Sequence, residues 1–98
     1  MRLIFTDHLK TRLKQRKISA KFVREVFKQN PEKYWDTLRK HNVIVGDIFY
    51  EGSTRKVLVA YDTIGNTVEV ITIHKVTEEQ IKQRLNSRRW IHEKNKSN

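Results

Sequence analysis

The sequence of 98 residues predicts an α+β domain with the element order β-α-α-β-β-β-α, in which a helical hairpin packs on a small antiparallel sheet. Two early segments carry apolar residues at helical spacing, and the middle of the chain alternates apolar and polar residues between short turns. A capping signal then opens a third helix. The length suffices for one hydrophobic core. We therefore expect a single domain over residues 1–91 and a flexible basic tail over residues 92–98.

The first segment, residues 2–6, has the composition of a short strand. Asp7 is a suitable N-cap for a helix over residues 8–17, because its carboxylate can accept hydrogen bonds from the first free amides. Leu9 and Leu13 are four residues apart and are predicted to face the core.

The second helix is predicted over residues 20–29, with Ser19 as its N-cap and Asn30-Pro31 as its end. Four apolar residues form a stripe along one side of it: Phe22, Val23, Val26 and Phe27. This stripe predicts that the helix packs against the sheet.

The middle of the chain predicts three strands. They span residues 43–51, 56–62 and 67–75, with turns at 52–54 and 64–66. Residues 34–42 favour a strand without deciding for it. In the last strand Val68 and Val70 would face one side, and Ile71 and Ile73 the other. Apolar residues on both faces predict a central position in the sheet.

The third helix is predicted to begin at Thr77, which forms a capping box with Gln80. Ile81 and Leu85 would be its buried residues, and Trp90-Ile91 would dock its end.

The chain is strongly basic, with 21 Lys and Arg against 11 Asp and Glu and a formal net charge of +10. Such a charge is typical of nucleic-acid binders. A solubilising surface, or a face neutralised by an acidic protein partner, would explain it as well. There is no cysteine, which excludes disulfides and cysteine-based zinc sites. No apolar run is long enough to span a bilayer and the N-terminus does not read as a secretory signal, so we expect a cytoplasmic protein without a membrane partner.

His8, Arg12 and Arg16 are four residues apart, so on a helix they form one row along a single edge. In a basic protein the natural partner of this row is a phosphate. Leu9 and Leu13 lie about one hundred degrees further round the helix, so the row borders the buried stripe. A structural role for His8 and Arg12, half-buried and bonded to backbone or to acids, therefore ranks ahead of catalysis.

The order, size and charge of these elements resemble the RelE/ParE superfamily of small toxins, and most closely its compact branch related to BrnT. The matching motifs are His-x3-Arg-x3-Arg on the first helix (His8, Arg12, Arg16), Ile18-Ser19 after it, the strand Val68–Ile73, and the ending Arg84–Ile91. The resemblance covers nearly the whole chain.

The resemblance implies the toxin of a toxin–antitoxin pair, held by an acidic antitoxin protein. Many RelE-like members cut mRNA without a metal or other cofactor, often on the ribosome. ParE-like members act on DNA gyrase instead. A non-catalytic RNA- or DNA-binding module and a gyrase- or protein-directed toxin therefore remain alternatives to an endoribonuclease.

Metal-free RNA cleavage needs a base for the 2′-hydroxyl, an acid for the 5′-oxygen and cations for the phosphorane. RelE-like sites draw these from Arg, Lys, His and Tyr on the open sheet face. We expect His74, Arg55 and Arg88 to be catalytic, with His74 on the face of Thr72 and Val70 and Lys75 on the other. The expected RNA-binding residues are Arg16, Lys56, Arg84, Arg89 and Tyr50. For Arg55 and Lys56 taken singly, ordinary charge beside a turn is the better interpretation, and for Arg84 and Arg88 a solvated helix face is at least as good. For His74, a structural histidine bonded to a backbone carbonyl at the strand end is an equally good interpretation. No metal site is predicted, because the four histidines are scattered and no acidic cluster accompanies them.

Overall fold

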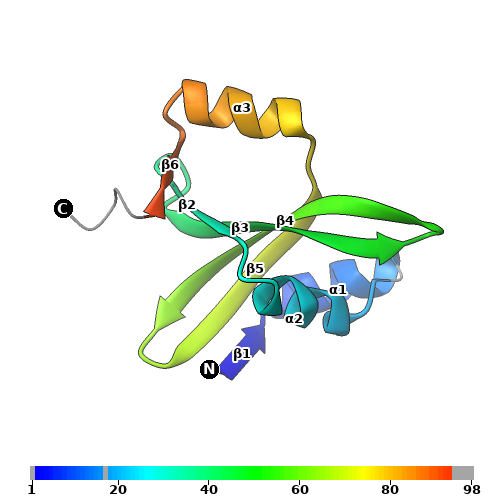
Figure 1. The fold of residues 1–98 in the computed structure, drawn as a ribbon. Helices are drawn as coiled ribbons and strands as arrows, with labels where there is room; N and C mark the ends of the chain where they lie inside the picture. Colours follow the sequence, from blue (N-terminus) through cyan, green and yellow to red (C-terminus); the bar gives the residue numbers. More distant parts are fainter. Residues whose placement is uncertain (1, 17, 94–98) are drawn as a thin grey trace.

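A computed structural model of the protein describes residues 2–16 and 18–93. Within these ranges the elements are β1 (Arg2–Phe5), α1 (Asp7–Arg16), α2 (Ala20–Lys28), β2 (Glu32–Asp36), β3 (His41–Tyr50), β4 (Ser53–Ile64), β5 (Thr67–Lys75), α3 (Glu78–Asn86) and β6 (Trp90–His92) (Figure 1). The predicted α+β class is confirmed. The order is β-α-α-β-β-β-β-α-β, with two more strands than the sequence predicted.

The strands form one sheet in the order β1-β5-β4-β3-β2-β6. The pairs β5-β4, β4-β3, β3-β2 and β2-β6 are all antiparallel. β1 instead runs parallel to β5, with Arg2 opposite Thr67 and Phe5 opposite Val70. The sheet is therefore mixed, and the prediction of an antiparallel sheet was wrong. Local periodicity shows that a segment is a strand, but it does not reveal which distant strand it joins or in which direction.

The two additional strands lie side by side at one edge of the sheet. β2 occupies part of the region that the sequence left undecided, and β6 pairs with it, His92 lying opposite Tyr34. Trp90 begins β6 with only 1% of its surface exposed, and its ring stacks on that of Tyr34 at 5.2 Å. This burial holds the end of the chain against the sheet, so His92 belongs to a strand rather than to a tail. Residues 94–98 of the predicted tail lie outside the described residues.

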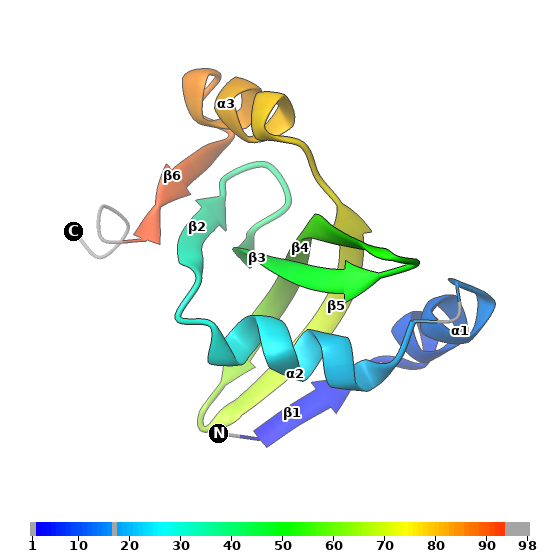
Figure 2. The ribbon, with the colours of Figure 1, turned by 45° about the vertical axis from the view of Figure 1, so that its right-hand side comes forward.

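Helices cover both faces of the sheet (Figures 1 and 2). On one face α1 and α2 bury Leu9, Leu13, Val23 and Val26 against the strands. On the other face α3 buries Ile81 in a second core, whose other members include Tyr34, Val43, Val45, Leu58, Ala60, Val76 and Trp90. We refer to the two sides as the α1/α2 face and the α3 face.

The N-caps of α2 and α3 are the residues that the sequence predicted, but the N-cap of α1 is a different residue. The Ser19 hydroxyl accepts from the Lys21 amide, and Thr77 and Gln80 form the predicted capping box. At α1, however, Thr6 Oγ1 accepts from the Leu9 amide at 3.1 Å, while Asp7 is already helical. Thr6 is therefore the N-cap, and the Asp7 carboxylate stabilises the first turn through the helix dipole.

A β-bulge in β5 changes which residues share a face. Ala60 pairs with Thr72, but the next residue, Tyr61, pairs with Val70, so Ile71 has no opposite residue. Beyond the bulge the alternation is inverted. Ile73 therefore joins Val70 in the core of the α1/α2 face, while Ile71 packs on the α3 face. The predicted grouping of Val70 with residues 72 and 74 was wrong for this reason.

Candidate functional site

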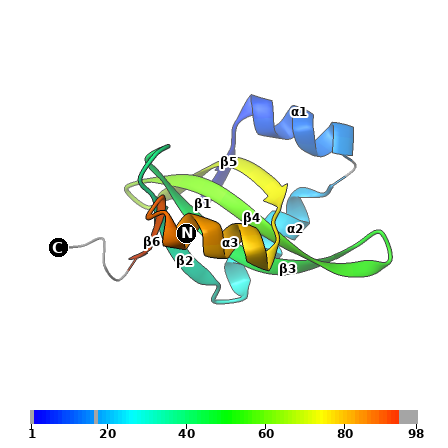
Figure 3. The same ribbon diagram turned by 90° about the horizontal axis from the view of Figure 1, so that it is seen from above.

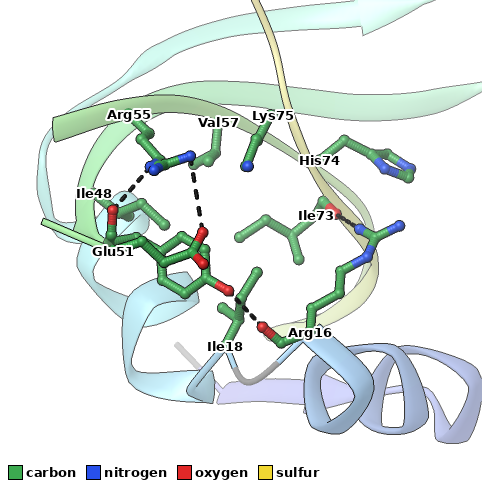
Figure 4. Close-up of a pocket in the computed structure, with 10 residues that line it drawn as sticks. Arg16, Ile18, Ile48, Glu51, Arg55, Val57, Ile73, His74 and Lys75 are labelled. Atoms are coloured by element: carbon green, nitrogen blue, oxygen red, sulfur yellow. Dashed lines mark hydrogen bonds and ion pairs between the residues drawn. The ribbon is translucent and has the colours of Figure 1, made fainter. Parts of the chain in front are cut away.

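His74 lies where two cavities meet at the end of β5. The larger, of about 580 Å³, opens on the α3 face, and we call it the basic cleft. The Asp36 carboxylate lines it together with a set of basic side chains: Arg12, Arg39, His41, His74, Lys75, Arg84 and Arg89. The smaller, of about 410 Å³, we call the apolar pocket; its floor is Ile18, Ile48, Val57 and Ile73, and His74 and Lys75 line it too (Figure 4). The two residues at the strand end thus connect the two cavities.

The basic cleft lies between α1 and α3, over the middle strands. Seen from above, α1 and α3 lie on opposite sides of β5 (Figure 3). Leu58, Ala60, Ile71 and Thr72 line the cleft from β4 and β5. The bulge at Ile71 brings His74 to this face, because a regular strand would have turned it toward the α1/α2 core.

The short β1 explains how α1 reaches the cleft. β1 pairs with β5 only as far as Val70, so from Ile71 onward the outer edge of β5 has no strand partner in the part of the chain that the structure describes. α1 packs along this part of β5, and Arg16 Nη1 donates to the Ile73 carbonyl at 3.1 Å. Arg16 thereby satisfies a backbone acceptor at a sheet edge.

Two residues of the His8-Arg12-Arg16 row border the cavities and His8 lines neither, so the structural role that the sequence favours for His8 and Arg12 stays a prediction. Arg12 lines the basic cleft, and Arg16 lines the apolar pocket beside it. Arg12 Nε donates to His8 Nε2 at 2.9 Å. His8 is exposed rather than half-buried, and it orients Arg12 at the cleft.

His74 is surrounded by positive charge. Burial lowers its pKa below the ordinary value, and Arg16, Arg12, Arg84 and Arg39 lower it further. The imidazole is therefore neutral at neutral pH, which is the form that accepts a proton. Nε2 lies 2.9 Å from Thr72 Oγ1, and the direction of that hydrogen bond depends on the tautomer. Thr72 thus fixes the orientation of the ring toward the cleft.

Two predicted RNA-binding arginines, Arg84 and Arg89, line the cleft from the side of α3 and β6. The Arg84 guanidinium lies over the Trp90 ring, 5.0 Å from its centre. Arg89 Nη2 lies 3.4 Å from Asp36 Oδ2, and the Asp36 side chain is almost fully buried. Burial would raise the pKa of Asp36, but hydrogen bonds from the Arg39 amide, Arg89 and the Leu38 amide outweigh it and lower the pKa. Arg89 is thus partly neutralised, whereas Arg84 has no carboxylate at salt-bridge distance among the described residues.

Arg55 and Tyr50 lie at the apolar pocket, not in the basic cleft (Figure 4). Arg55 Nε donates to the Tyr50 carbonyl at 2.8 Å, and Nη1 is 3.9 Å from Glu51 Oε1. The Tyr50 hydroxyl donates to the Arg16 carbonyl. The side chain of Arg55 thus lies across the pocket from His74, whose ring points away from it.

Three of the predicted site residues line neither cavity: Lys56, Arg88 and His8. Lys56 Nζ lies 3.5 Å from Asp47 and 3.3 Å from Glu78, so it joins β3 to α3. Burial would lower the pKa of Lys56, but these two carboxylates outweigh it and raise the pKa. Arg88 is exposed, with a positive φ of 62° in the turn before β6. The expected catalytic set of His74, Arg55 and Arg88 is therefore not brought together.

Several residues of the cleft were missed or set aside in the sequence, among them Arg12, Arg39, His41 and Lys75. The position of Arg39 could have been suspected from Asp36, because aspartate favours such turns. Asp36 Oδ1 accepts from the amides of Leu38 and Arg39 in an Asx turn, which places Arg39 beside the cleft. Lys75 lines both cavities because β5 ends there and alternation no longer constrains it.

The cleft combines several cations with the imidazoles of His74 and His41, the Thr72 hydroxyl and the Asp36 carboxylate. The cations suit the binding of a phosphodiester, and the neutral His74 suits the transfer of a proton beside it. Among the described residues, no group of three His, Asp or Glu side chains comes together as a metal site. None of the helices in residues 2–16 and 18–93 is long and apolar enough to cross a membrane.

Comparisons with known proteins give no relative against which to set this arrangement. No protein-family model, no curated protein and no solved structure matches the chain.

Proposed function

We propose that this protein binds single-stranded RNA in the basic cleft and cleaves it without a metal ion, as the toxin of a toxin–antitoxin pair. The observation that carries the proposal is the setting of His74. Burial and four arginines lower its pKa, so a proton acceptor stands at neutral pH among the groups that would hold the phosphate.

In the proposed reaction His74 takes the proton of the ribose 2′-hydroxyl, and the 2′-oxygen attacks the adjacent phosphorus. The bond from phosphorus to the 5′-oxygen breaks, which leaves a 2′,3′-cyclic phosphate and a free 5′-hydroxyl. Arg12 and Arg84 stabilise the added negative charge from opposite walls of the cleft. His74, protonated in the first step, returns that proton to the leaving oxygen.

The toxin role rests on the sequence resemblance to the RelE/ParE superfamily and on the net charge of +10. An acidic antitoxin would cover the cleft and neutralise its cations in the resting complex. Free protein would then be the active form.

A non-catalytic RNA-binding module is the second candidate, and one contact favours it. His74 Nε2 is already engaged by Thr72 Oγ1 at 2.9 Å, which would leave Nδ1 as the remaining ring nitrogen. In this case the arginines bind phosphates and His74 orients the cleft without transferring a proton.

The test incubates purified protein with a single-stranded RNA in excess EDTA and maps new ends by primer extension. We expect cleavage by the wild type, none by His74→Ala, and retained RNA binding by that variant. The matched control is His92→Ala, because His92 is also half-buried but lines neither cavity. It should cleave like the wild type.

Three outcomes separate the alternatives. RNA binding without new ends in the wild type would support the non-catalytic module and reject the nuclease. Growth arrest on induction, with intact RNA ends and altered DNA supercoiling, would point to a gyrase-directed toxin. Equal cleavage by His74→Ala and wild type would remove His74 from the mechanism.

A further inference from the structure

The apolar pocket is a second feature beside the cleft, and the proposed cleavage does not use it. Its floor consists of Ile18, Ile48, Val57 and Ile73, from the α1–α2 connection and three strands. Its volume of about 410 Å³ lies within the range of small-molecule sites, roughly 300–1,000 Å³. An apolar floor of this kind favours a flat, poorly hydrated group over a phosphate.

The rim of the pocket is polar, and its arginine is held in place. Arg55 is held by the Tyr50 carbonyl and by Glu51, and its guanidinium carbon lies 5.7 Å from the centre of the Tyr50 ring. Figure 4 shows the Lys75 amine pointing into the space above Ile73. The rim thus offers donors from Arg55 and Lys75 and an acceptor from Glu51. A nucleobase needs this combination, because its edge carries both donors and acceptors and its faces are apolar.

The pocket adjoins the basic cleft at the end of β5, where His74 and Lys75 line both cavities. A phosphate bound beside His74 would therefore have its neighbouring nucleotide at the mouth of the pocket. Arg16, which bonds to Ile73 between the two cavities, would lie along the connecting backbone. Because Arg55 and Lys75 outnumber Glu51, the rim carries a net positive charge. This charge disfavours a cationic ligand and attracts the anionic backbone to which the base is attached.

We propose that the apolar pocket receives one unstacked base of a single-stranded RNA whose phosphate lies in the basic cleft. The inference rests on the proposed function, since the phosphate subsite is the cleft itself. The pocket is then the determinant of sequence preference, because it is where base edges meet side chains. The cleft alone holds only the backbone.

The experiment uses short 2′-O-methyl oligonucleotides, which lack the attacking hydroxyl and stay intact. One is abasic throughout, and matched ones carry a single base at the central position. Affinities are measured by fluorescence anisotropy at fixed salt. For the wild type we expect the base to strengthen binding roughly tenfold, the scale of one enclosed base.

Ile18→Trp fills the pocket and Arg55→Ala removes part of its rim, so both should abolish the gain from the base and keep the affinity for the abasic chain. Ile64→Trp is the matched control, because Ile64 is 67% exposed at the β4–β5 turn and lines neither cavity. It should keep the tenfold gain. The circular dichroism spectrum of each variant establishes that it is folded.

Two results would contradict the proposed base site. One is that the base adds no affinity in the wild type although the abasic chain binds. The other is that the affinity gain from the base is unchanged in both folded pocket variants. A failure of the proposed function looks different. The abasic chain would then bind neither the wild type nor the pocket variants, whatever base is added.

Discussion

Arg16 Nη1 lies 3.1 Å from the carbonyl oxygen of Ile73, which joins the last turn of α1 to the open edge of β5. This contact has two effects. It satisfies a backbone acceptor that the short β1 leaves without a strand partner, and it sets a guanidinium next to His74. One side chain thus links the packing of α1 to the electrostatics of the site.

Replacing Arg16 should separate these two effects. Arg16→Ala removes the hydrogen bond and the charge, so we expect a loss of about 1 kcal/mol in the free energy of unfolding and a rise of the His74 pKa. Arg16→Lys keeps the charge and should leave the His74 pKa lowered. The pKa is followed by NMR titration of the imidazole, and stability by urea unfolding. An unchanged His74 pKa in Arg16→Ala would contradict the assigned charge effect.

The stability of the protein should depend on pH through His74. Its pKa in the folded protein lies below the ordinary value of 6.5, so the unfolded chain binds more protons between the two values. The free energy of unfolding should therefore be greatest above about pH 6.5 and fall as the pH drops through that value. His74→Gln should show a weaker decrease. Urea unfolding of both proteins at several pH values measures the difference, and parallel curves would speak against a lowered pKa.

The salt dependence of RNA binding should identify the cations of the cleft. Arg39 is exposed in the turn after β2 and lines the cleft, so Arg39→Ala should weaken binding and reduce the slope of log affinity against log salt by about 0.7. Arg24→Ala is the matched control. Arg24 belongs to α2, its guanidinium lies over the ring of Phe5 in β1, and it lines neither cavity. Equal slopes for the two variants would place the RNA elsewhere.

Gly46 should be intolerant of any side chain. A Cβ at this position would lie 2.6 Å from Gln29 Oε1 and 2.9 Å from Val26 Cγ1. Gln29 cannot swing away without losing both hydrogen bonds to the Asp47 backbone. Gly46→Ala should therefore cost about 1–3 kcal/mol in urea unfolding. In the double variant with Gln29→Ala the loss should be smaller than the sum of the single losses, and strict additivity would show that Gln29 is not the obstacle.

Elements with a local signal could be predicted from the sequence. Ser19 and Thr77 cap helices because their side chains reach amides two or three residues away, and neighbouring residues suffice to predict that. The strand Thr67–Lys75 was predicted with its observed bounds, because its alternating β-branched residues are flanked by turn and capping residues.

The arrangement of the site depended on pairing between distant segments and could not be read locally. The bulge at Ile71 arises from the register with Ala60 and Tyr61, and it turns His74 to the α3 face of the sheet. Arg12 was set aside for a similar reason. β1 ends its pairing with β5 at Phe5, which leaves room for α1 at the edge of β5, and the sequence near Arg12 does not show where that pairing ends.

The parallel pairing of β1 with β5 also sets the order in which the molecule can be completed. During synthesis β1 and α1 emerge first, yet the strand partner of β1, Thr67–Val70, is made after most of the other strands. The intervening strands pair with their neighbours in sequence and can form as soon as each turn is made. Arg12 and Arg16 therefore dock late, and a chain interrupted before β5 carries their charges but has no cleft in which to use them.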